Sequence, residues 1–452
     1  MLELIEEFIK STGIAEFFTS GGWKNLVMIL IALLLMYFAI FKQAEPYLLI
    51  PISFGVLLVN LPLGGIFEKS TDVLYSVEQL ATSTGLTLDQ ARQFFTSLGL
   101  DVEQSYQLSK IIELGQNNLD AINALKNLNE LELKHLVDFL NQETQYSGLL
   151  GYLYYGVQTG IYPCLIFLGI GATTDFGPLI SNPKSMILGA AAQIGIFITF
   201  LGALLLGFTP QEASSIGIIG GADGPTAILV TKTLAPHLLS SISIAAYSYM
   251  ALVPFIQPPI IRLLTTKKER LIKMEEPTEV SKTKRILFPI IVTVVVVLLI
   301  PSCAPLIGCL MLGNLIKETG VVPKLTEAAG NTILYLVTIL LGLCVGATAN
   351  AETFLSLNTI KIFALGIFAF ATATAGGVLI GKLMCKMTKG KINPMIGAAG
   401  VSAVPMAARV VHKEGVKEDP SNFLLMHAMG PNVAGVIGSA VAAGLLMLLF
   451  GA

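Results

Sequence analysis

The chain has 452 residues, of which 54% are hydrophobic and 13% are charged, and its mean hydropathy is +0.74. Soluble globular domains carry about 25% charged residues, so this composition argues against an ordinary soluble domain and favours a protein surrounded by membrane lipid. The formal net charge of −2 argues against a nucleic-acid partner.

Apolar segments long enough, or nearly long enough, to cross a bilayer recur along the chain. They lie at about 25–41, 45–64, 149–170, 186–208, 240–262, 286–301, 303–316, 331–347, 360–383 and 423–450. The run from 286 to 316 is divided at Pro301 because proline interrupts helices. The first segment follows an acidic start and lacks a small-residue cleavage site, so we expect a retained span rather than a signal peptide. The sequence therefore predicts an all-α polytopic membrane protein with about ten spans.

Three stretches depart from this pattern. Segments 212–233 and 394–409 are rich in glycine and proline and too short or too broken to cross, so we expect them to be re-entrant. Residues 70–147 carry charges at helical spacing and predict a soluble, mostly helical insert for packing or assembly. The predicted division is 1–69 (two spans), 70–147 (insert), 148–262 (rest of the first repeat), 263–285 (basic loop) and 286–452 (second repeat, with Asn393–Arg409).

Basic residues gather in the loops 262–285 and 382–391. Cytoplasmic loops of membrane proteins carry an excess of lysine and arginine, so both loops are expected in the cytoplasm. An even number of predicted crossings separates them, as this orientation requires. Counting onward puts the C-terminus outside, and counting backward puts the insert outside.

The two halves of the chain share sequence patterns at matched spacing. Gly171-Ala172-Thr173 recurs as Gly346-Ala347-Thr348, and each copy is followed some forty residues later by a second shared pattern. That pattern is Ile216, Gly217, Gly220, Pro225 and Ala227 in the first half, and Ile396, Gly397, Gly400, Pro405 and Ala407 in the second. Five predicted crossings per half give repeats of opposite orientation, which is the usual plan of secondary transporters.

The sharpest chemical signal is the run Gly220-Gly221-Ala222-Asp223-Gly224-Pro225-Thr226. A carboxylate inside an apolar, broken segment is costly and marks a functional site by default. Glycines expose backbone carbonyls, and together with the Thr226 hydroxyl they form an oxygen-only ligand set that suits a hard cation such as Na⁺. The alternative is that Asp223 caps the following helix at a membrane surface.

The partner segment from Asn393 to Arg409 adds neutral oxygens at Asn393 and Ser402. Arg409 ends the apolar stretch, where a simpler role is to snorkel to the interface. Asn432 is an amide beside a proline inside a long apolar span, and an ion is one partner that would satisfy it. Tyr247 and Tyr249 follow the Asp223 segment, where aromatic packing and a hydroxyl relay are both open.

Three stretches carry a resemblance to a known family: Gly217–Ala227, Asn393–Arg409 and His427–Gly435. They resemble the signatures of the β subunit of the sodium-pumping biotin-dependent decarboxylases, which act on oxaloacetate, methylmalonyl-CoA or glutaconyl-CoA. The likeness covers nearly the whole chain, including Ala245–Pro254.

The resemblance implies a division of labour among subunits. A carboxyltransferase α subunit loads CO₂ onto biotin held by a carrier protein or domain, and a small membrane subunit completes the complex. The β subunit receives carboxybiotin, releases CO₂ with consumption of a proton, and couples this to Na⁺ export across the inner membrane. The family's β subunits look like elevator-type transporters that assemble as oligomers, expected to be trimers.

Residue roles also follow from the resemblance alone. The Na⁺ ligands would be Asp223, Asn393, Ser402 and Asn432, with Gly397 allowing close backbone approach to the ion. Tyr249 would help to deliver the proton, together with Asp223 in the catalytic set. Arg409 would face carboxybiotin.

Two further functions stay open from the residues themselves. A Na⁺-coupled secondary transporter of a small organic anion would use the same architecture. A passive membrane anchor for a soluble enzyme is the third option, but it leaves Asp223 unexplained.

Overall fold

The computed structural model describes residues 22–43, 46–62, 146–275 and 278–451, with 16–17, 64, 66 and 68–69 in addition. Apart from a two-residue antiparallel pair, β1 (Glu68–Lys69) with β2 (Tyr146–Ser147), the secondary structure described there is helical. The chain divides into one compact unit of Met1–Gly64 and Leu153–Ala452 and a second of Gly65–Tyr152. The predicted insert 70–147 lies almost entirely outside the described residues.

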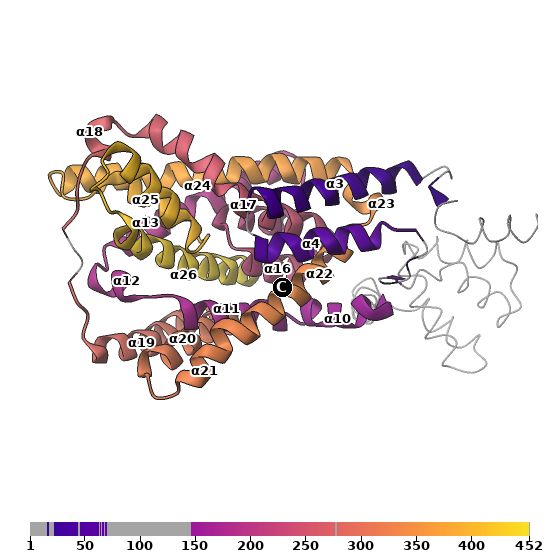
Figure 1. The fold of residues 1–452 in the computed structure, drawn as a ribbon, viewed down its shortest axis with the longest axis horizontal. Helices are drawn as coiled ribbons and strands as arrows, with labels where there is room; N and C mark the ends of the chain where they lie inside the picture. Colours follow the sequence, from indigo (N-terminus) through magenta and orange to yellow (C-terminus); the bar gives the residue numbers. More distant parts are fainter. Residues whose placement is uncertain are drawn as a thin grey trace, which may run out of the picture. The chain divides into compact units, whose positions relative to one another are not determined.

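Helices follow one another closely along the first compact unit (Figure 1). Up to the basic loop they are α3 (Gly22–Phe41), α4 (Pro46–Val59), α10 (Gly148–Gln158), α11 (Ile161–Thr173), α12 (Gly177–Ser181), α13 (Ser185–Ala192), α14 (Ile194–Leu205), α15 (Pro210–Gly217), η1 (Ile218–Gly221), α16 (Gly224–Leu234), η2 (Pro236–Leu238), α17 (Leu239–Leu264) and α18 (Lys267–Arg270). After it come α19 (Lys282–Leu299), η3 (Pro301–Cys303), α20 (Ala304–Thr319), α21 (Pro323–Glu327), η4 (Ala328–Ile333), α22 (Leu334–Ala347), α23 (Ala351–Phe354), α24 (Leu357–Met387), η5 (Pro394–Gly400), α25 (Met406–Glu418) and α26 (Leu425–Phe450).

Five helical runs among the described residues are long and apolar enough to cross a membrane. They are Gly22–Phe41, Ser185–Leu205, Pro323–Ala347, Leu357–Met387 and Leu425–Phe450. Two bent pairs raise the number to seven if each counts as one span: Leu149–Gln158 with Ile161–Thr173, bent by 67°, and Pro236–Met250 with Leu252–Leu264, bent by 62°. The described residues thus give five to seven candidate spans by length and composition, and the predicted ten are not confirmed.

The remaining predicted spans are helical but fall short for physical reasons. α4 has 14 residues and α20 has 16, and at a rise of about 1.5 Å per residue neither covers about 30 Å of hydrocarbon. α19 has 18 residues but begins with three basic side chains, Lys282, Lys284 and Arg285. The break between α19 and α20 falls at Pro301, where the proline predicted it.

Two helix pairs make the same close crossing. A Cβ on Gly171 of α11 would lie 2.0 Å from Leu310 O of α20, and one on Gly313 of α20 would lie 2.1 Å from Leu168 O of α11. α22 and α4 cross in the same way: a Cβ on Gly346 would lie 2.1 Å from Ile52 O, and one on Gly55 would lie 2.4 Å from Leu343 O. Both pairs pack backbone against backbone, which glycine alone permits. The glycines of the two Gly-Ala-Thr patterns therefore occupy corresponding crossings.

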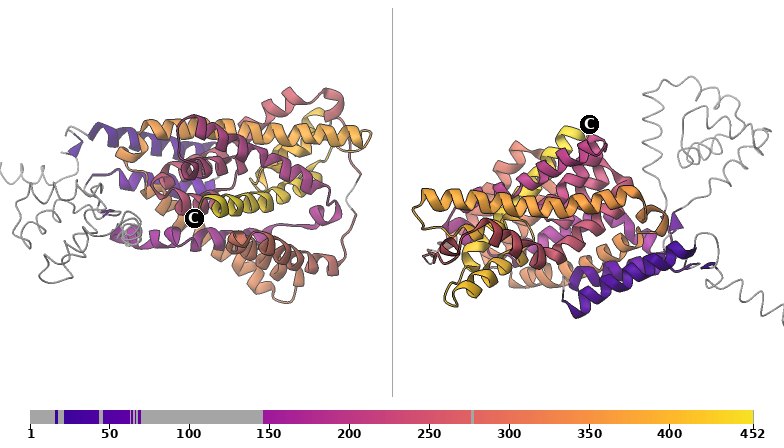
Figure 2. Two further views of the ribbon diagram at one scale, coloured as in Figure 1. Left: turned by 180° about the vertical axis from the view of Figure 1, so that it is seen from behind. Right: turned by 90° about the horizontal axis from the view of Figure 1, so that it is seen from above.

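The two predicted broken segments lie among the most buried helices. The first consists of α15, η1 and α16, and the second of η5, a non-helical stretch and α25. Both lie against α26, and η5 also packs along α24, the long helix that Figure 2 shows extended across its neighbours. Residues of both segments belong to the buried apolar cores, so the segments are interior elements and not surface loops.

Candidate functional site

The first broken segment is built by its local sequence. Thr209 and Glu212 form a capping box that starts α15, and the chain leaves helical geometry at Ala222, whose φ is 58°. Asp223 then caps α16, its Oδ1 accepting from the Thr226 N–H at 3.3 Å, and Pro225 occupies the first turn, where it needs no donor.

Asp223 is the helix cap that one sequence interpretation proposed, but it does not lie at a surface. Only 6% of the residue is exposed, and its Oδ2 accepts a hydrogen bond from Ser439 Oγ of α26 at 2.8 Å. The carboxylate thus accepts two hydrogen bonds, and no cationic side chain lies beside it among the described residues. Its remaining lone pairs and its negative charge can therefore bind a positive ligand.

The second broken segment meets the first at this point. The Ser402 N–H donates to Gly221 O at 3.0 Å, which joins the two breaks directly. Asn432 of α26 donates its Nδ2 to Ala399 O at 2.9 Å and to Val401 O at 2.7 Å, and so fixes the backbone that leads to Ser402. The contacts therefore link Asp223, Ser402 and Asn432 into one buried region.

Several oxygens of this region are buried without a hydrogen-bond partner among the described residues. They include Ser402 Oγ, Asn432 Oδ1 and Thr226 Oγ1. No three His, Cys, Asp or Glu side chains of the described chain gather in a way that could hold a metal ion. A cation at Asp223 would therefore be held by one carboxylate and neutral oxygens, a set that suits a monovalent hard ion.

Sequence reasoning missed two residues of this region, Ser439 and Gln193. Gln193 lies at the break between α13 and α14, where its Nε2 donates to Gly189 O and Gly435 O, while its Oε1 is buried and unpartnered among the described residues. A Cβ on Gly221 would lie 3.1 Å from Ser439 Cβ and 3.5 Å from Gln193 Oε1, so both side chains border the break. An isolated polar residue within each apolar span was the signal that could have found them.

Asn393 and Gly397 have other neighbours. Asn393 donates its Nδ2 to Arg270 O and Ile272 O, and its Oδ1 accepts from the Met395 N–H. It begins η5 whereas Ser402 follows the end of η5, and seven residues of 3₁₀ helix span roughly 14 Å. Gly397 packs on α24, where a Cβ would lie 2.0 Å from Gly377 O. Their contacts with other elements are with the basic loop and α24, and their place among the Na⁺ ligands stays a prediction.

The tyrosines occupy two different environments. Tyr249 packs its ring against Phe363 and Phe370 of α24 and donates its hydroxyl to Phe363 O. Tyr247 instead lies against the residue after Asp223, since a Cβ on Gly224 would lie 2.2 Å from its ring, and its hydroxyl is buried without a partner in the described chain. Of the two, Tyr247 is the one that borders the Asp223 break.

Arg409 lies away from the buried region, exposed on the first turn of α25, with no ion-pair partner among the described residues. It lines a hollow of about 400 Å³ whose walls are apolar at Pro254, Phe255 and Pro258. Three lysines and one glutamate line the same hollow: Lys42, Lys413, Lys417 and Glu414, the last two paired with each other. A second hollow of about 510 Å³, against α3 and α4, shares Gln43, Met406 and Arg409 with the first. Arg409 thus lies where a cationic hollow and an apolar one adjoin.

Comparison with known proteins identifies the family. A family model described as the Na⁺-transporting oxaloacetate decarboxylase beta subunit matches residues 24–450. The chain is 50% identical over 452 residues to the methylmalonyl-CoA decarboxylase subunit beta of Propionigenium modestum, covering 100% of both chains. It is 48% identical to a probable oxaloacetate decarboxylase beta chain of Vibrio cholerae, covering 94% of this chain and 95% of that one. It is 46% identical to the glutaconyl-CoA decarboxylase subunit beta of Acidaminococcus fermentans, covering 96% and 95%. The chain therefore belongs to the family of Na⁺-transporting decarboxylase β subunits, the membrane subunits of decarboxylases that are coupled to Na⁺ transport.

Proposed function

We propose that this chain releases CO₂ from carboxybiotin and couples that step to the export of Na⁺ with consumption of a proton. The observation that carries the proposal is the buried Asp223 carboxylate at the point where two broken segments meet. Such a junction near the middle of a transporter is where ions bind. Family membership favours this function over a Na⁺-coupled symporter for an organic anion.

The ion site we propose centres on Asp223, Ser402 and Asn432. Contacts within the structure support adding Ser439 and Gln193, which border the same break. Asn393 and Gly397 complete the ligand set that the family resemblance implies. One carboxylate can hold either Na⁺ or a proton, so Asp223 is suited to exchange the exported ion for the consumed proton.

Carboxybiotin is proposed to enter the hollow beside Arg409. The apolar wall at Pro254, Phe255 and Pro258 suits a fused ring, and the guanidinium offers two parallel donors for a carboxylate. When bound, carboxybiotin supplies CO₂ by cleavage of its N–C bond, and the freed nitrogen takes up the proton. Arg409 would orient the carboxylate, and Tyr249 is the residue that the resemblance assigns to proton delivery.

The finer architecture also stays a proposal: about ten crossings, two inverted repeats and an elevator-type movement. The matched glycine crossings of α11 with α20 and of α4 with α22 support the repeat. In each pair, one helix comes from the first half and its partner from the second, as a pseudo-two-fold axis would require. The five predicted segments 1–69, 70–147, 148–262, 263–285 and 286–452 follow from this scheme, with 263–285 facing the cytoplasm.

The partners we propose are a carboxyltransferase α subunit, a biotin carrier protein or domain, a small membrane subunit and two further copies of this chain in a trimer. The location is the cytoplasmic membrane. Relatives named for three different substrates, methylmalonyl-CoA, oxaloacetate and glutaconyl-CoA, are 46–50% identical to this chain at similar coverage. This supports a chain that meets carboxybiotin and never the substrate that supplied its CO₂.

The test is reconstitution of the complex in liposomes with ²²Na⁺ and its carboxylated carrier as the donor. We expect Na⁺ movement that follows CO₂ release in time and stops without the carrier. Uptake of an organic anion by this chain alone, driven by a Na⁺ gradient and independent of biotin, would contradict the proposal.

A further inference from the structure

A polar side chain interrupts the buried stripe of α17 near the hollow. The stripe runs along Val253, Gln257 and Ile261, which are 0%, 1% and 0% exposed and lie about one helical turn apart. Burying an amide among apolar side chains costs free energy unless its polar atoms have partners. Packing alone therefore does not explain a glutamine in this stripe.

The amide of Gln257 reaches the second broken segment. Its Nε2 donates to Ala398 O at 2.9 Å, near the end of η5, where the last carbonyls of a helix lack partners within it. The next carbonyl, Ala399 O, accepts from Asn432 Nδ2 at 2.9 Å. One amide from α17 and one from α26 thus fix consecutive carbonyls where η5 ends and the chain continues to Ser402.

The same turn of α17 forms the apolar wall of the hollow beside Arg409. Pro254, Phe255 and Pro258 line that hollow. Pro258 and the proline after it have no N–H, so the carbonyls of Pro254 and Phe255 lack their usual helical donors. The backbone ladder holds this turn less firmly, and side-chain contacts such as that of Gln257 contribute more to its position.

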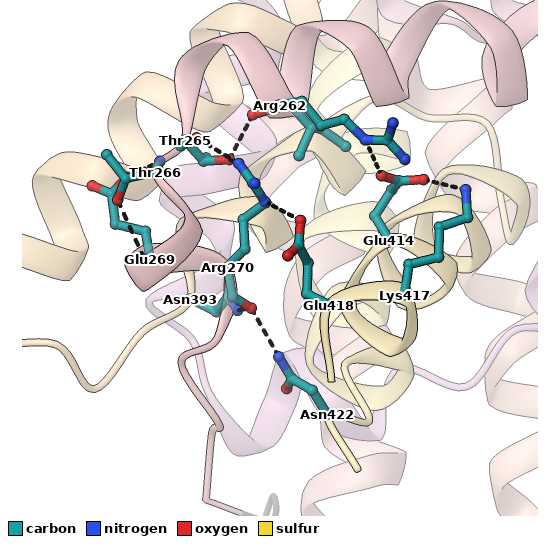
Figure 3. A network of polar contacts seen from close by, with 11 residues as sticks. Arg262, Thr265, Thr266, Glu269, Arg270, Asn393, Glu414, Lys417, Glu418 and Asn422 are labelled. Atoms are coloured by element: carbon teal, nitrogen blue, oxygen red, sulfur yellow. Dashed lines mark hydrogen bonds and ion pairs between the residues drawn. The ribbon is translucent and has the colours of Figure 1, made fainter. Parts of the chain in front are cut away.

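One turn farther on, α17 is joined to the opposite wall of the hollow. Arg262 Nε lies 2.7 Å from Glu414 Oε2 of α25 (Figure 3). Glu414 lines the hollow, and so does Arg409 in the first turn of the same helix. A molecule that enters between α17 and α25 therefore contacts the turn that carries Gln257.

We propose that Gln257 is a positioning residue that couples the hollow beside Arg409 to the ion segment between η5 and Ser402. A biotin ring against the α17 wall shifts this turn, and the amide transmits the shift to Ala398 O. The Oε1 of Gln257 is buried without a partner among the described residues, so the amide can move with Ala398 O and break no second bond.

Coupling of this kind is reciprocal in binding free energy, so a ring that changes the affinity for Na⁺ is itself bound more or less tightly when Na⁺ is present. The inference rests on the proposed function for the identity of the two ligands. It rests on the observed contacts for the link between their sites.

The variant Gln257→Met tests the link, because methionine keeps the length and apolar packing of the side chain but removes the donor to Ala398 O. Gln257→Asn is a second variant, which keeps the amide but is one methylene too short to reach. The assembled complex is used. The KM and kcat for the carboxylated carrier are measured at limiting and at saturating Na⁺, and ²²Na⁺ binding is measured without the carrier.

In the wild type we expect the KM for the carrier to change about fivefold or more between the two Na⁺ concentrations. In both variants the change should fall below about twofold, while kcat at saturation and ²²Na⁺ binding stay within about threefold, because the ion ligands remain. A merely structural role would lower kcat or ²²Na⁺ binding and leave the Na⁺ dependence of the KM as it is.

Ser241→Ala is the matched control, since it removes another buried hydrogen bond of α17, from Ser241 Oγ to Thr359 Oγ1 at 2.8 Å. It should keep the wild-type Na⁺ dependence of the KM. Loss of that dependence in Ser241→Ala as well would show a general loosening of α17 and overturn the inference. Elution of each variant complex at the wild-type position shows that the chain has folded.

A KM that depends on Na⁺ in Gln257→Met and Gln257→Asn as it does in the wild type would also overturn the inference, as would a wild-type KM that does not respond to Na⁺. Both results leave the proposed function standing. Wild-type CO₂ release that needs no Na⁺ would instead contradict the proposed function, and the inference with it.

Discussion

The two broken segments share a sequence pattern but differ in what they present to the interior. In the first, α16 begins at once after Asp223, so the carboxylate is both a helix cap and, among the residues that the structure describes, the only charge at the break. The position corresponding to Asp223 in the repeat is Ala403, and α25 begins only at Met406. Residues 401–405 are therefore non-helical, and the Asn432 amide donates to the carbonyls of Val401 and Ala403.

This difference shows how duplicated elements can take separate tasks. The first segment supplies charge, and the second supplies neutral oxygens at one end and the cationic helix α25 at the other. A site with a single carboxylate is neutralised by a single Na⁺ or a single proton, which is what an exchange of the two needs.

The largest effect is expected at Asp223. Asp223→Asn removes the charge that offsets the desolvation of Na⁺ but keeps the side-chain size, so Na⁺-dependent CO₂ release should fall at least 100-fold, about 2.7 kcal/mol. The rate is measured against Na⁺ concentration in the assembled complex. Glu327→Gln, at an exposed position, is the control and should leave the rate unchanged. Normal Na⁺ dependence in Asp223→Asn would remove the first segment from the ion site.

The next effect concerns Arg409 in the second segment. Arg409→Lys keeps the charge and loses the planar pair of donors, so kcat/KM for the carboxylated carrier should fall about 10- to 100-fold. Direct Na⁺ binding should persist. Lys413→Arg, in the same hollow, adds donors without removing any and serves as the comparison. If Arg409→Lys uses the carrier normally, Arg409 is an interface anchor.

Corresponding glycines should differ in their tolerance to alanine. A Cβ on Gly397 would lie 2.0 Å from Gly377 O, a backbone atom that cannot turn aside, whereas a Cβ on Gly217 would lie 3.0 Å from Ile196 O. Gly397→Ala should therefore cost about 1–3 kcal/mol of folding free energy and Gly217→Ala less. Thermal unfolding of the two purified variants decides this, and equal stability would refute the tighter packing of the second segment.

A smaller effect is expected at Ser439. Ser439→Ala removes the hydroxyl that donates to Asp223 Oδ2 and should change Na⁺ affinity by about 1–2 kcal/mol, roughly 5- to 30-fold. Isothermal titration with Na⁺ measures it. The same change at Ser302, which bonds to Gly444 O away from the break, should leave Na⁺ affinity as it is.

The smallest effect concerns the pH dependence of hydrogen exchange in residues 265–273, which we expect to be absent near neutral pH. Hydrogen bonds from the Ser421 hydroxyl and N–H, with Lys273, lower the pKa of Asp419 to about 2. Burial would raise the pKa of Glu414, but hydrogen bonds from Arg262 and Lys417 hold it below its ordinary value. A carboxyl group whose pKa is lower in the folded protein stabilises the fold at any pH above its unfolded-state pKa of about 4. That stabilisation is lost as the pH falls from there towards the pKa of the folded state.

Hydrogen exchange of residues 265–273, which Asp419 and Glu414 hold through Lys273 and Arg262, should therefore be constant between about pH 5 and pH 8 after correction for intrinsic rates, and should rise only below about pH 4. A loss of protection between pH 6 and 8 would show that another titrating group holds residues 265–273 in place.

The sequence by itself determined the all-helical membrane class, because long apolar runs leave backbone groups no partner except their own helix. It determined the breaks as well, since glycine and proline act locally, and both broken segments and the division at Pro301 lie where these residues predicted them. The buried charge at Asp223 was also readable, because a carboxylate in an apolar run is conspicuous without any knowledge of its neighbours.

Only the tertiary structure decided which polar residues share a site. Ser439 and Gln193 are ordinary polar residues within their own helices, and they border Asp223 because α26 and the α13–α14 break pack against η1. Asn393 is close to Ser402 in sequence, but only the fold shows that its amide donates to Arg270 O and Ile272 O of the basic loop. The number of candidate spans depends on where helices end and bend. Packing between segments that are remote in sequence sets those ends and bends, and hydropathy read along the sequence does not record such packing.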